Sequence, residues 1–489
     1  MRAPLAGLPF VCTGTDGVVE AAADVLEALG AQVIRVPVVH GPVHAQRIEA
    51  LEPIGAIDAT RSLGEPPFPV LRLVPVDAAS AWAASGALAL TGPGAGAPVA
   101  CDPRIATRLL GAGAVSQLLA ACREVTLNLD PLALLGERAA IAGFGRRGGS
   151  SVGGNAHLVR AADGWIALNL ARGDDLAALP ALLDGDVASD APWHEVEAAI
   201  RVRTRAQLGV QARLLSLPLG EVPEPGERKR PASPYVIGDP AVGERTARLR
   251  PEHVVDAQPA PRTSLVIDLS SLWAGPLAAS LVGQCGARVI KVEGATRPDG
   301  ARRGPAAFFD LLNFDKECVA LDFADGRDIA LLRRLVERAD VVIEGSRPRV
   351  MDALGIDPMT VALDHNTAWI SITGHGRYGV DAQRVAFGDD AAAAAGLVVG
   401  EPPMFVADAG ADPITALYAT CAAMAALVGN RGQVIDVSLR RCAAYVGGDA
   451  MPIGTEWNGS VAAPHAREVR GSARAHGADT SAIRAEFAE

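Results

Sequence analysis

The sequence lacks several patterns by which common classes of protein are recognised. Its nine His and seven Cys residues are scattered, without a C-x-x-C step, so neither a metal site nor a disulfide framework is indicated, and the thiols fit a reducing cytoplasm. No uninterrupted apolar run reaches 18 residues without a charge, and the start of the chain has no signal peptide, so no membrane segment is expected. A formal net charge of −11 argues against nucleic acid as a partner.

Aromatic residues make up only 4% of the chain and hydrophobic residues 49%, so the core must be built mainly from Ala, Val and Leu. A chain of 489 residues is long enough for two or more domains with sizeable cores.

Residues 264–294 have the pattern of a β-strand, a helix and a second β-strand. Apolar runs at Leu265–Leu269 and Arg288–Val292 flank a helix that begins with the small residues Ala274, Gly275 and Pro276. Short apolar runs beside a helix indicate parallel strands covered on both faces. We therefore predict a doubly wound, Rossmann-like α/β domain whose ligand lies at the carboxyl ends of the strands. No G-x-G-x-x-G follows the first strand, so a nicotinamide cofactor is not indicated.

The first part of the chain repeats this pattern. Pro9–Thr13 and Gln32–Val36 are predicted strands, and Val18–Leu29 is the helix between them. The segments GAQVIRV (30–36) and GARVIKV (286–292) are nearly the same, which indicates partial duplication within one chain.

Composition divides the chain into four predicted parts. Residues 1–217 form a first, degenerate unit that includes a smaller α+β domain, and residues 218–263 form a linker rich in proline. Residues 264–450 form the Rossmann-like catalytic domain, and residues 451–489 form an extended crossing that ends in a short helix.

A series of motifs follows the second β-α-β unit in a fixed order. They are LNFDKECVALDFAD (312–325), ADVVIEGSRPRVMDALGID (339–357), WISITGHGRYG (369–379), AFGDDAAAAAGL (386–397), PPMFVADAGADPITALYATCAAMAAL (402–427) and GQVIDVSL (432–439). This series resembles the family III CoA transferases (the CaiB/BaiF family), which also include α-methylacyl-CoA racemases. The resemblance implies an enzyme that moves CoA from an acyl-CoA to an acceptor carboxylic acid, with CoA as substrate thioester and no metal.

In that family an Asp attacks the thioester and becomes an aspartyl-CoA intermediate, and the matching position here is Asp412. The residues themselves predict that Asp412 caps a helix whose first residue is Pro413 and whose N-terminus favours an ionised carboxylate. Asp408 is the rival for the same role, and Asp102 is a second-rank candidate because Asp102-Pro103 repeats the Asp-Pro step.

The resemblance also implies contacts with CoA. By position in the family's motifs they are Leu272, Trp273, Ala274, Lys291, Ala320, Leu321, Asp322, Gly345, Ser346 and Arg347. Arg347 and Lys291 are the predicted phosphate ligands, because guanidinium and ammonium groups bind phosphate. Family members form interlocked dimers, so we expect a homodimer or an internal pseudo-dimer.

Two other functions stay open at this point. In the racemases a His stands where this chain has Asp389, so Asp389 and Asp412 would flank the substrate's α-carbon; His375 is a poor substitute and is expected to be a loop residue bonded to nearby backbone. A duplicated chain of this kind can also be a CoA-binding protein without catalysis. Two loops are further candidates: Gly92–Gly96 as a cover over the thioester, and Arg146-Arg147 as a ligand for a phosphate or for the carboxylate of the acceptor.

Overall fold

The computed structural model describes residues 3–36, 52–59, 66–74, 76–238, 263–447 and 454–488. Its largest sheet has the strand order β12-β11-β10-β13-β14-β17-β9. The strands are β9 (Val236–Ile237), β10 (Leu265–Leu269), β11 (Arg288–Gly294), β12 (Glu317–Leu321), β13 (Val341–Glu344), β14 (Ala368–Thr373) and β17 (Gln433–Ser438). Every neighbouring pair is parallel except β17 with β9. The chain runs from β10 to one side and returns at β13 to the other, and ligands bind beside the carboxyl ends of strands at such a point.

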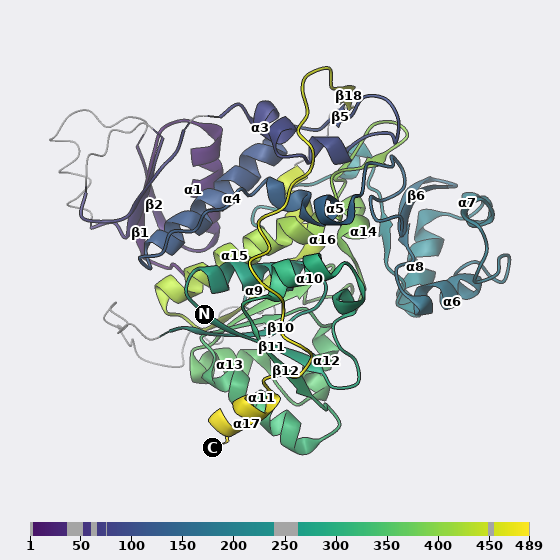
Figure 1. Cartoon of the computed structure of the whole chain (residues 1–489). Coiled ribbons are helices and arrows are strands. Elements are labelled where there is room, and N and C mark those ends of the chain that lie inside the picture. The colour runs from purple at the N-terminus through teal and green to yellow at the C-terminus, as the bar shows by residue number, and fades with distance from the viewer. Residues whose placement is uncertain are drawn as a thin grey trace.

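Helices cover both faces of this sheet (Figure 1). The helices on one face are α9 (Ala274–Gln284), α10 (Ala306–Asn313), α15 (Ala411–Gly429) and α16 (Leu439–Gly447). The other face carries α11 (Gly326–Arg338), α12 (Pro348–Ala353), α13 (Pro358–His365) and α17 (Thr480–Glu486). Between β14 and α15 the chain forms α14 (Gly388–Ala394) and the hairpin β15 (Val398–Val399) and β16 (Met404–Phe405). A 3-10 turn, η5 (Gly300–Arg303), precedes α10.

A second parallel sheet lies in the first part of the chain, with the order β2-β1-β3-β4. Its strands are β1 (Pro9–Thr13), β2 (Gln32–Val36), β3 (Gly55–Asp58) and β4 (Val70–Arg72). The helices and short elements that follow are α1 (Gly17–Ala28), α3 (Ala78–Ala84), η1 (Leu88–Leu90), β5 (Val99–Ala100), α4 (Arg104–Ala121), η2 (Ala133–Leu135) and α5 (Glu137–Ala142). The order corresponds to β11-β10-β13-β14 of the large sheet, and the strands β1, β2 and β10 have the bounds that the sequence predicts.

The two sheets share one hydrophobic core. Helix α4 packs against α1 on one side and against α15 on the other, and α15 packs in turn against α9 (Figure 1). Apolar side chains from Leu5 to Val446 belong to this one cluster, so the predicted parts 1–217 and 264–450 are not separated by their cores. Helix α15 is long and apolar enough to cross a membrane, but it lies buried in the middle of this layer.

The small domain is an antiparallel sheet with its own core. It contains β6 (Ala156–Ala161), β7 (Gly164–Asn169), β8 (Leu219–Glu221), α6 (Gly173–Leu182), α7 (Trp193–Arg201) and α8 (Arg205–Leu215). The start of the predicted linker is therefore structured, because β8 joins this sheet and β9 joins the large one after the turn η3 (Pro225–Glu227). Residues 239–262 of that linker lie outside the described residues.

The C-terminal segment crosses the front of the molecule as an extended chain (Figure 1). It starts at β18 (Thr455–Glu456), which pairs with β5, and it ends in α17 against the large sheet. On its way it bonds to the first part of the chain at Ala83 and to the second part at Asp310. This segment therefore ties together regions that are far apart in the sequence.

Candidate active site

Three acidic side chains, Asp389, Asp408 and Asp412, lie around one arginine at the start of helix α15, and Asp390 lies next to Asp389. Asp389 and Asp390 lie in the first turn of α14, Asp408 precedes α15, and Asp412 lies in the first turn of α15. The arginine is Arg138 of α5, which comes from the first part of the chain. It forms a bidentate ion pair with the fully buried Asp408, with Nε 3.0 Å from Oδ2.

Arg138 also reaches the first turn of the large sheet. Its guanidinium lies 5.0 Å from the centre of the Trp273 ring, a cation–π contact. Trp273 is buried and packs edge-on against Phe308 of α10. The sequence analysis named Trp273 but missed Arg138; the only available signal was the Glu137-Arg138 pair of charges within an otherwise apolar short helix.

Asp412 is held where a substrate can reach it. Helix α15 begins at Ala411 with Gly410 as its N-cap, so Asp412 lies in the first turn rather than capping the helix as predicted. The backbone N–H of Gly388 lies near this carboxylate and lowers its pKa. A Cβ atom at Gly388 would lie 2.6 Å from Asp412 Oδ2 and would overlap the carbonyl oxygen of Ala409, so only glycine fits there. Asp412 keeps part of its surface exposed, unlike its three acidic neighbours.

The acidic cluster is shifted toward its neutral form. Burial raises the pKa of Asp412 to about 7, Arg138 opposes that shift, and the neighbouring Asp389 adds to it. Burial likewise raises the pKa of Asp389 to about 7 and that of Asp390 to about 8. The helix N-terminus was expected to keep Asp412 ionised at any neutral pH, but loss of hydration outweighs this effect.

Asp390 has a supporting role that the sequence did not indicate. It accepts hydrogen bonds from the backbone N–H of Phe387 (2.9 Å) and from Nδ2 of Asn169 (3.2 Å) in the small domain. The small domain therefore contacts the same short helix that presents Asp389 to the site.

The backbone on either side of Asp408 is strained. Ala407 and Ala409 both have left-handed φ angles, of 59° and 45°, which alanine rarely adopts. Such strain persists where the surroundings impose it and is concentrated at functional sites. The N–H of Ala407 donates to Thr91 Oγ1 (3.1 Å), directly before the loop Gly92–Gly96, so the structure brings that predicted loop beside the acidic segment.

The first strand-to-helix turn of the large sheet is held by a buried ion pair. Lys291 is 1% exposed, its Nζ lies 3.0 Å from Asp299 Oδ2, and it donates to the carbonyl of Ser270. Asp299 in turn accepts from the N–H of Leu272, which has a left-handed φ of 71°. The prediction of Lys291 as a phosphate ligand is therefore wrong in this structure, since the ammonium group is buried and holds the turn.

The other predicted CoA contacts divide into accessible and covered positions. Leu272, Asp322 and Gly345 are exposed and Ser346 and Arg347 partly so, whereas Trp273, Ala274 and Leu321 are packed inside. Ala320 is partly exposed but its N–H donates to Thr480 Oγ1, and Gly477 lies close above it, so the C-terminal segment covers this position.

Arg347 lies in a cluster of positive charge. Burial lowers its pKa, and so do Arg349, Arg172 and Arg297 nearby. Among the described residues no ion pair is formed by Arg347, Arg349 or Arg297; Arg347 donates only to Ser216 Oγ of the small domain (3.2 Å). A group of unneutralised guanidinium groups at the carboxyl edge of the sheet is suited to bind phosphates.

Two further sequence candidates are not part of the cluster. Asp102 lies just before α4 and is paired with Arg104, whose Nε is 2.7 Å from Oδ2. His375 was expected to bond to nearby backbone, but neither ring nitrogen has a hydrogen-bond partner within the described part of the chain. Burial lowers the pKa of His375 to about 3, so the ring is neutral.

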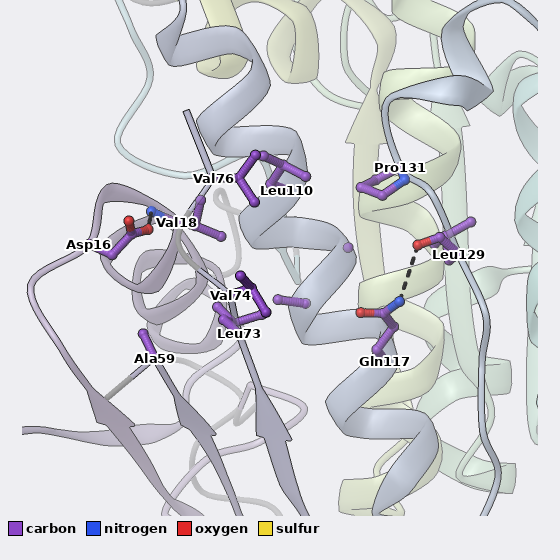
Figure 2. A pocket seen from close by; sticks show the side chains of 12 residues that line it. Asp16, Val18, Ala59, Leu73, Val74, Val76, Leu110, Gln117, Leu129 and Pro131 are labelled. Carbon is purple, nitrogen blue, oxygen red and sulfur yellow. Dashed lines mark hydrogen bonds between the residues drawn. The ribbon is translucent and has the colours of Figure 1, made fainter. Parts of the chain in front are cut away.

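The first sheet has a cavity of its own, of about 130 Å³ (Figure 2). Val18, Leu73 and Val74 line it beside the carboxyl ends of β1 and β4, and Leu110 of α4 closes it. None of its lining residues is Lys or Arg, so this cavity does not suit a phosphate group as the Arg347 cluster does.

The site of this α/β protein is therefore a partly exposed carboxylate, Asp412, near the guanidinium group of Arg138, and comparison with known proteins shows what the chain is similar to. The model of CoA-transferase family III matches residues 264–478, which is somewhat less than half of the chain.

Several proteins that are similar to this chain are named as CoA-transferases. The chain is 33% identical to a succinate–glutarate CoA-transferase of Agrobacterium fabrum (36% of this chain, 49% of that protein). It is 30% identical to an acetyl-CoA:oxalate CoA-transferase of Acetobacter aceti (36% and 49%) and 29% identical to a succinyl-CoA–L-malate CoA-transferase alpha subunit of Chloroflexus aurantiacus (45% and 54%). The chain thus spans about half the length of these relatives. A solved CaiB/BaiF family protein of Brucella suis is 32% identical, over 38% of this chain and 55% of that one, with a TM-score of 0.35.

Proposed function

We propose that this chain is a CoA-transferase that uses Asp412 as its nucleophile. The observation that carries the proposal is the partly exposed Asp412 carboxylate, which lies near the cation of Arg138 and inside the region matched by the family model. The relatives named above transfer CoA between carboxylic acids, and an acyl-CoA and an acceptor acid are the proposed substrates here.

The proposed reaction begins with attack of the Asp412 carboxylate on the thioester carbonyl. The C–S bond breaks, the CoA thiolate leaves with the electron pair, and a mixed anhydride forms. The thiolate then attacks the Asp412 carbonyl carbon, which releases the first acid as a carboxylate and leaves an aspartyl-CoA thioester. The acceptor carboxylate attacks this thioester to give a second anhydride, and the returning thiolate forms the new acyl-CoA and restores Asp412.

The residues around Asp412 support these steps. Arg138 favours the ionised form of the nucleophile, because it opposes the effect of burial on the pKa of Asp412. Backbone N–H groups of the loops near Gly92 and Gly388 are proposed to stabilise the developing oxyanion. Arg347, with Arg297 and Arg349, is proposed to bind the phosphates of CoA at the turn formed by Leu272, Trp273 and Ala274.

The architecture supports an internal pseudo-dimer. In this proposal β10 to β17 form the Rossmann-like catalytic unit. The first unit, β1 to β4 with α1 and α4, is a degenerate copy of it, since α1 packs against α4 as α9 packs against α15. Such a chain needs no second copy to complete the helix layer, so light scattering should give the mass of one chain; a stable dimer would contradict this part. The proposed location is the cytoplasm.

The experiment that tests the function is covalent trapping. The protein is incubated with acetyl-CoA, succinyl-CoA or oxalyl-CoA, treated with hydroxylamine and analysed by peptide mass spectrometry. A hydroxamate at Asp412 in the wild type, and none in Asp412→Asn, is the expected result. A hydroxamate at Asp408 or Asp102 would identify that residue as the nucleophile instead. If no hydroxamate forms with any donor although CoA binds, the non-catalytic function is favoured.

A second function is favoured by one observation. Asp389 and Asp412 are adjacent acids whose pKa values both lie at about 7, so one can donate a proton while the other accepts one. This is the requirement of a racemase. Deuterium uptake at the α-carbon of a 2-methylacyl-CoA in D₂O, without an acceptor acid, would support racemization over transfer.

A further inference from the structure

The cavity of about 130 Å³ in the first part of the chain lies where a sheet of this kind binds a ligand. The chain runs from β1 to β2 on one side and returns at β3 on the other, so the order β2-β1-β3-β4 changes direction between β1 and β3. Asp16 follows β1, Ala59 follows β3, and both line the cavity (Figure 2). In open α/β sheets, ligands bind beside the carboxyl ends of the strands at such a point.

The walls of this cavity are apolar, and its size suits a small molecule. Val18 of α1, Leu73 after β4 and Leu110 of α4 form three of its sides. Val74 and Val76 also line it and are 61% and 47% exposed, so this side of the cavity faces solvent. An apolar cavity of about 150 Å³ in another protein binds one benzene molecule, so a volume of about 130 Å³ has room for about five heavy atoms.

The two polar side chains that line the cavity both offer hydrogen-bond acceptors. Asp16 is partly exposed; its Oδ1 accepts the N–H of Val18 (2.7 Å) as the N-cap of α1, and its Oδ2 has no hydrogen-bond partner among the described residues. Gln117 donates its Nε2 to the carbonyl of Leu129 (3.1 Å), which leaves Oε1 as an acceptor (Figure 2). This Oε1 has no partner in the described part of the chain and is not a buried atom, so a ligand can reach it.

Negative charge surrounds the cavity. None of its lining residues is Lys or Arg, whereas two further acids, Asp77 and Asp130, directly follow the lining residues Val76 and Leu129. Arg72, at the end of β4, is paired with a buried carboxylate of β3. Free acceptors in negative surroundings favour a cationic donor and disfavour a carboxylate or a phosphate.

We propose that this cavity binds a small primary amine, with its aliphatic chain against the apolar walls and its ammonium group paired with the carboxylate of Asp16. The first unit then has a ligand site whose charge preference is opposite to that of the arginine cluster around Arg347. The inference goes beyond the proposed transferase function and does not depend on it, because none of the residues that it uses belongs to the acidic cluster around Arg138.

The test titrates the protein with three molecules that share a four-carbon chain: butylamine, butan-1-ol and butyrate. Binding is followed by the methyl signals of Val74 in ¹³C-labelled protein, assigned from Val74→Ile. We expect butylamine to bind about tenfold more tightly than butan-1-ol, because a hydrogen bond between two charged groups is stronger than one to a neutral donor. Butyrate should not shift the signals.

The decisive variant is Asp16→Asn, which removes the charge and keeps the N-cap, since asparagine also accepts the N–H of Val18. It should weaken the binding of butylamine by about tenfold and leave that of butan-1-ol unchanged. The matched control is Asp130→Asn, at an exposed carboxylate outside the lining that likewise bonds to backbone N–H groups, and it should change neither affinity.

A second variant tests the location of the ligand. Leu110→Trp places a larger side chain in the cavity and should abolish the binding of both butylamine and butan-1-ol, while circular dichroism checks that the protein is folded. If this variant does not fold, Asp16→Asn decides alone. Equal affinity of the wild type for the amine and the alcohol, no binding of the amine, an equal loss in Asp16→Asn and Asp130→Asn, or amine binding that persists in folded Leu110→Trp would overturn the inference.

Discussion

At the scale of single residues, the site is governed by a competition between hydration and charge. Asp412 lies at a helix N-terminus and near Arg138, and both favour its ionised form. Burial acts against them and leaves its pKa at about 7. A nucleophile with this pKa is more basic than an ordinary carboxylate and is still half ionised at neutral pH, which suits attack on a thioester.

The first prediction concerns pH. Since the carboxylate is the proposed attacking form, kcat/KM should rise as pH increases through about 7 and level off at higher pH. Asp389 titrates in the same pH range, so this rise reports the ionisation of the two groups together. Asp412→Asn should abolish turnover. If kcat/KM does not change between pH 6 and pH 8, Asp412 is already ionised in this range, and burial raises its pKa less than expected.

The same substitution should stabilise the protein. The folded-state pKa of Asp412 is raised above its ordinary value, so the wild type loses stability as pH rises from about 4 to about 7 and stays penalised above that range. Asp412→Asn removes this loss and should increase the free energy of unfolding at pH 8 by on the order of 1–3 kcal/mol. Urea unfolding at pH 5 and pH 8 measures it, and an equal effect at both values would contradict the argument.

The next prediction concerns Arg138. Arg138→Gln leaves the fully buried Asp408 without its ion-pair partner, which should cost about 3–5 kcal/mol of stability. It also removes the cation that lowers the pKa of Asp412, so the acid limb of kcat/KM should move to higher pH. A purely structural role would lower stability and leave that limb in place, and Arg138→Lys, which keeps the charge, should leave it nearly unchanged.

At the scale of elements, α14 matters because its first residue has no side chain. Gly388→Ala would push a methyl group onto the Ala409 carbonyl and to 2.6 Å from Asp412 Oδ2, so α14 and α15 would have to separate. We expect activity to fall by tenfold or more, on the order of 1.4 kcal/mol in transition-state stabilisation, as catalytic geometry shifts. Gly173→Ala is the control, because an added Cβ there meets no atom within 4 Å and no left-handed backbone is involved; comparable losses in both variants would contradict the prediction.

Elements with strong local patterns could be predicted from the sequence, and contacts between distant segments could not. The apolar runs at β1 and β10 predicted the bounds found in the structure, because buried parallel strands are short apolar runs; β2 also has the predicted bounds, although only Val36 of it is buried. The motif order pointed to Asp412. Arg138 was missed because its importance depends on the fold bringing α5 close enough for an ion pair with Asp408, 270 residues away. Lys291 was misjudged because only the fold shows that it is buried and paired with Asp299.

At the scale of the whole molecule, the proposed active site contains residues from both parts of the chain. The proposed nucleophile comes from the second part, while Arg138 comes from the first and Asn169 from the small domain. This arrangement gives a physical reason for keeping a first unit whose own Asp102 is paired with Arg104. The hydrophobic core shared by α4 and α15 fixes the two parts of the chain relative to each other, and so positions Arg138 beside Asp408.

The extended C-terminal segment is the other connection, and it supports the last prediction. Arg467 of this segment pairs with Glu137, which is 0% exposed and adjacent to Arg138 on α5; Nε lies 2.6 Å from Oε1, and Nη2 lies 2.9 Å from Oε2. Arg467→Met would leave the buried Glu137 carboxylate without its ion-pair partner, keeping only the hydrogen bond from the backbone N–H of residue 467, which should lower the free energy of unfolding by about 3 kcal/mol in urea titrations at pH 7. Because Glu137 and Arg138 share one turn of α5, kcat should fall as well. Arg470→Met, at an exposed position of the same segment, should change neither the free energy of unfolding nor kcat. If the two variants have the same stability and kcat, the C-terminal segment does not hold α5 and Arg138 in place.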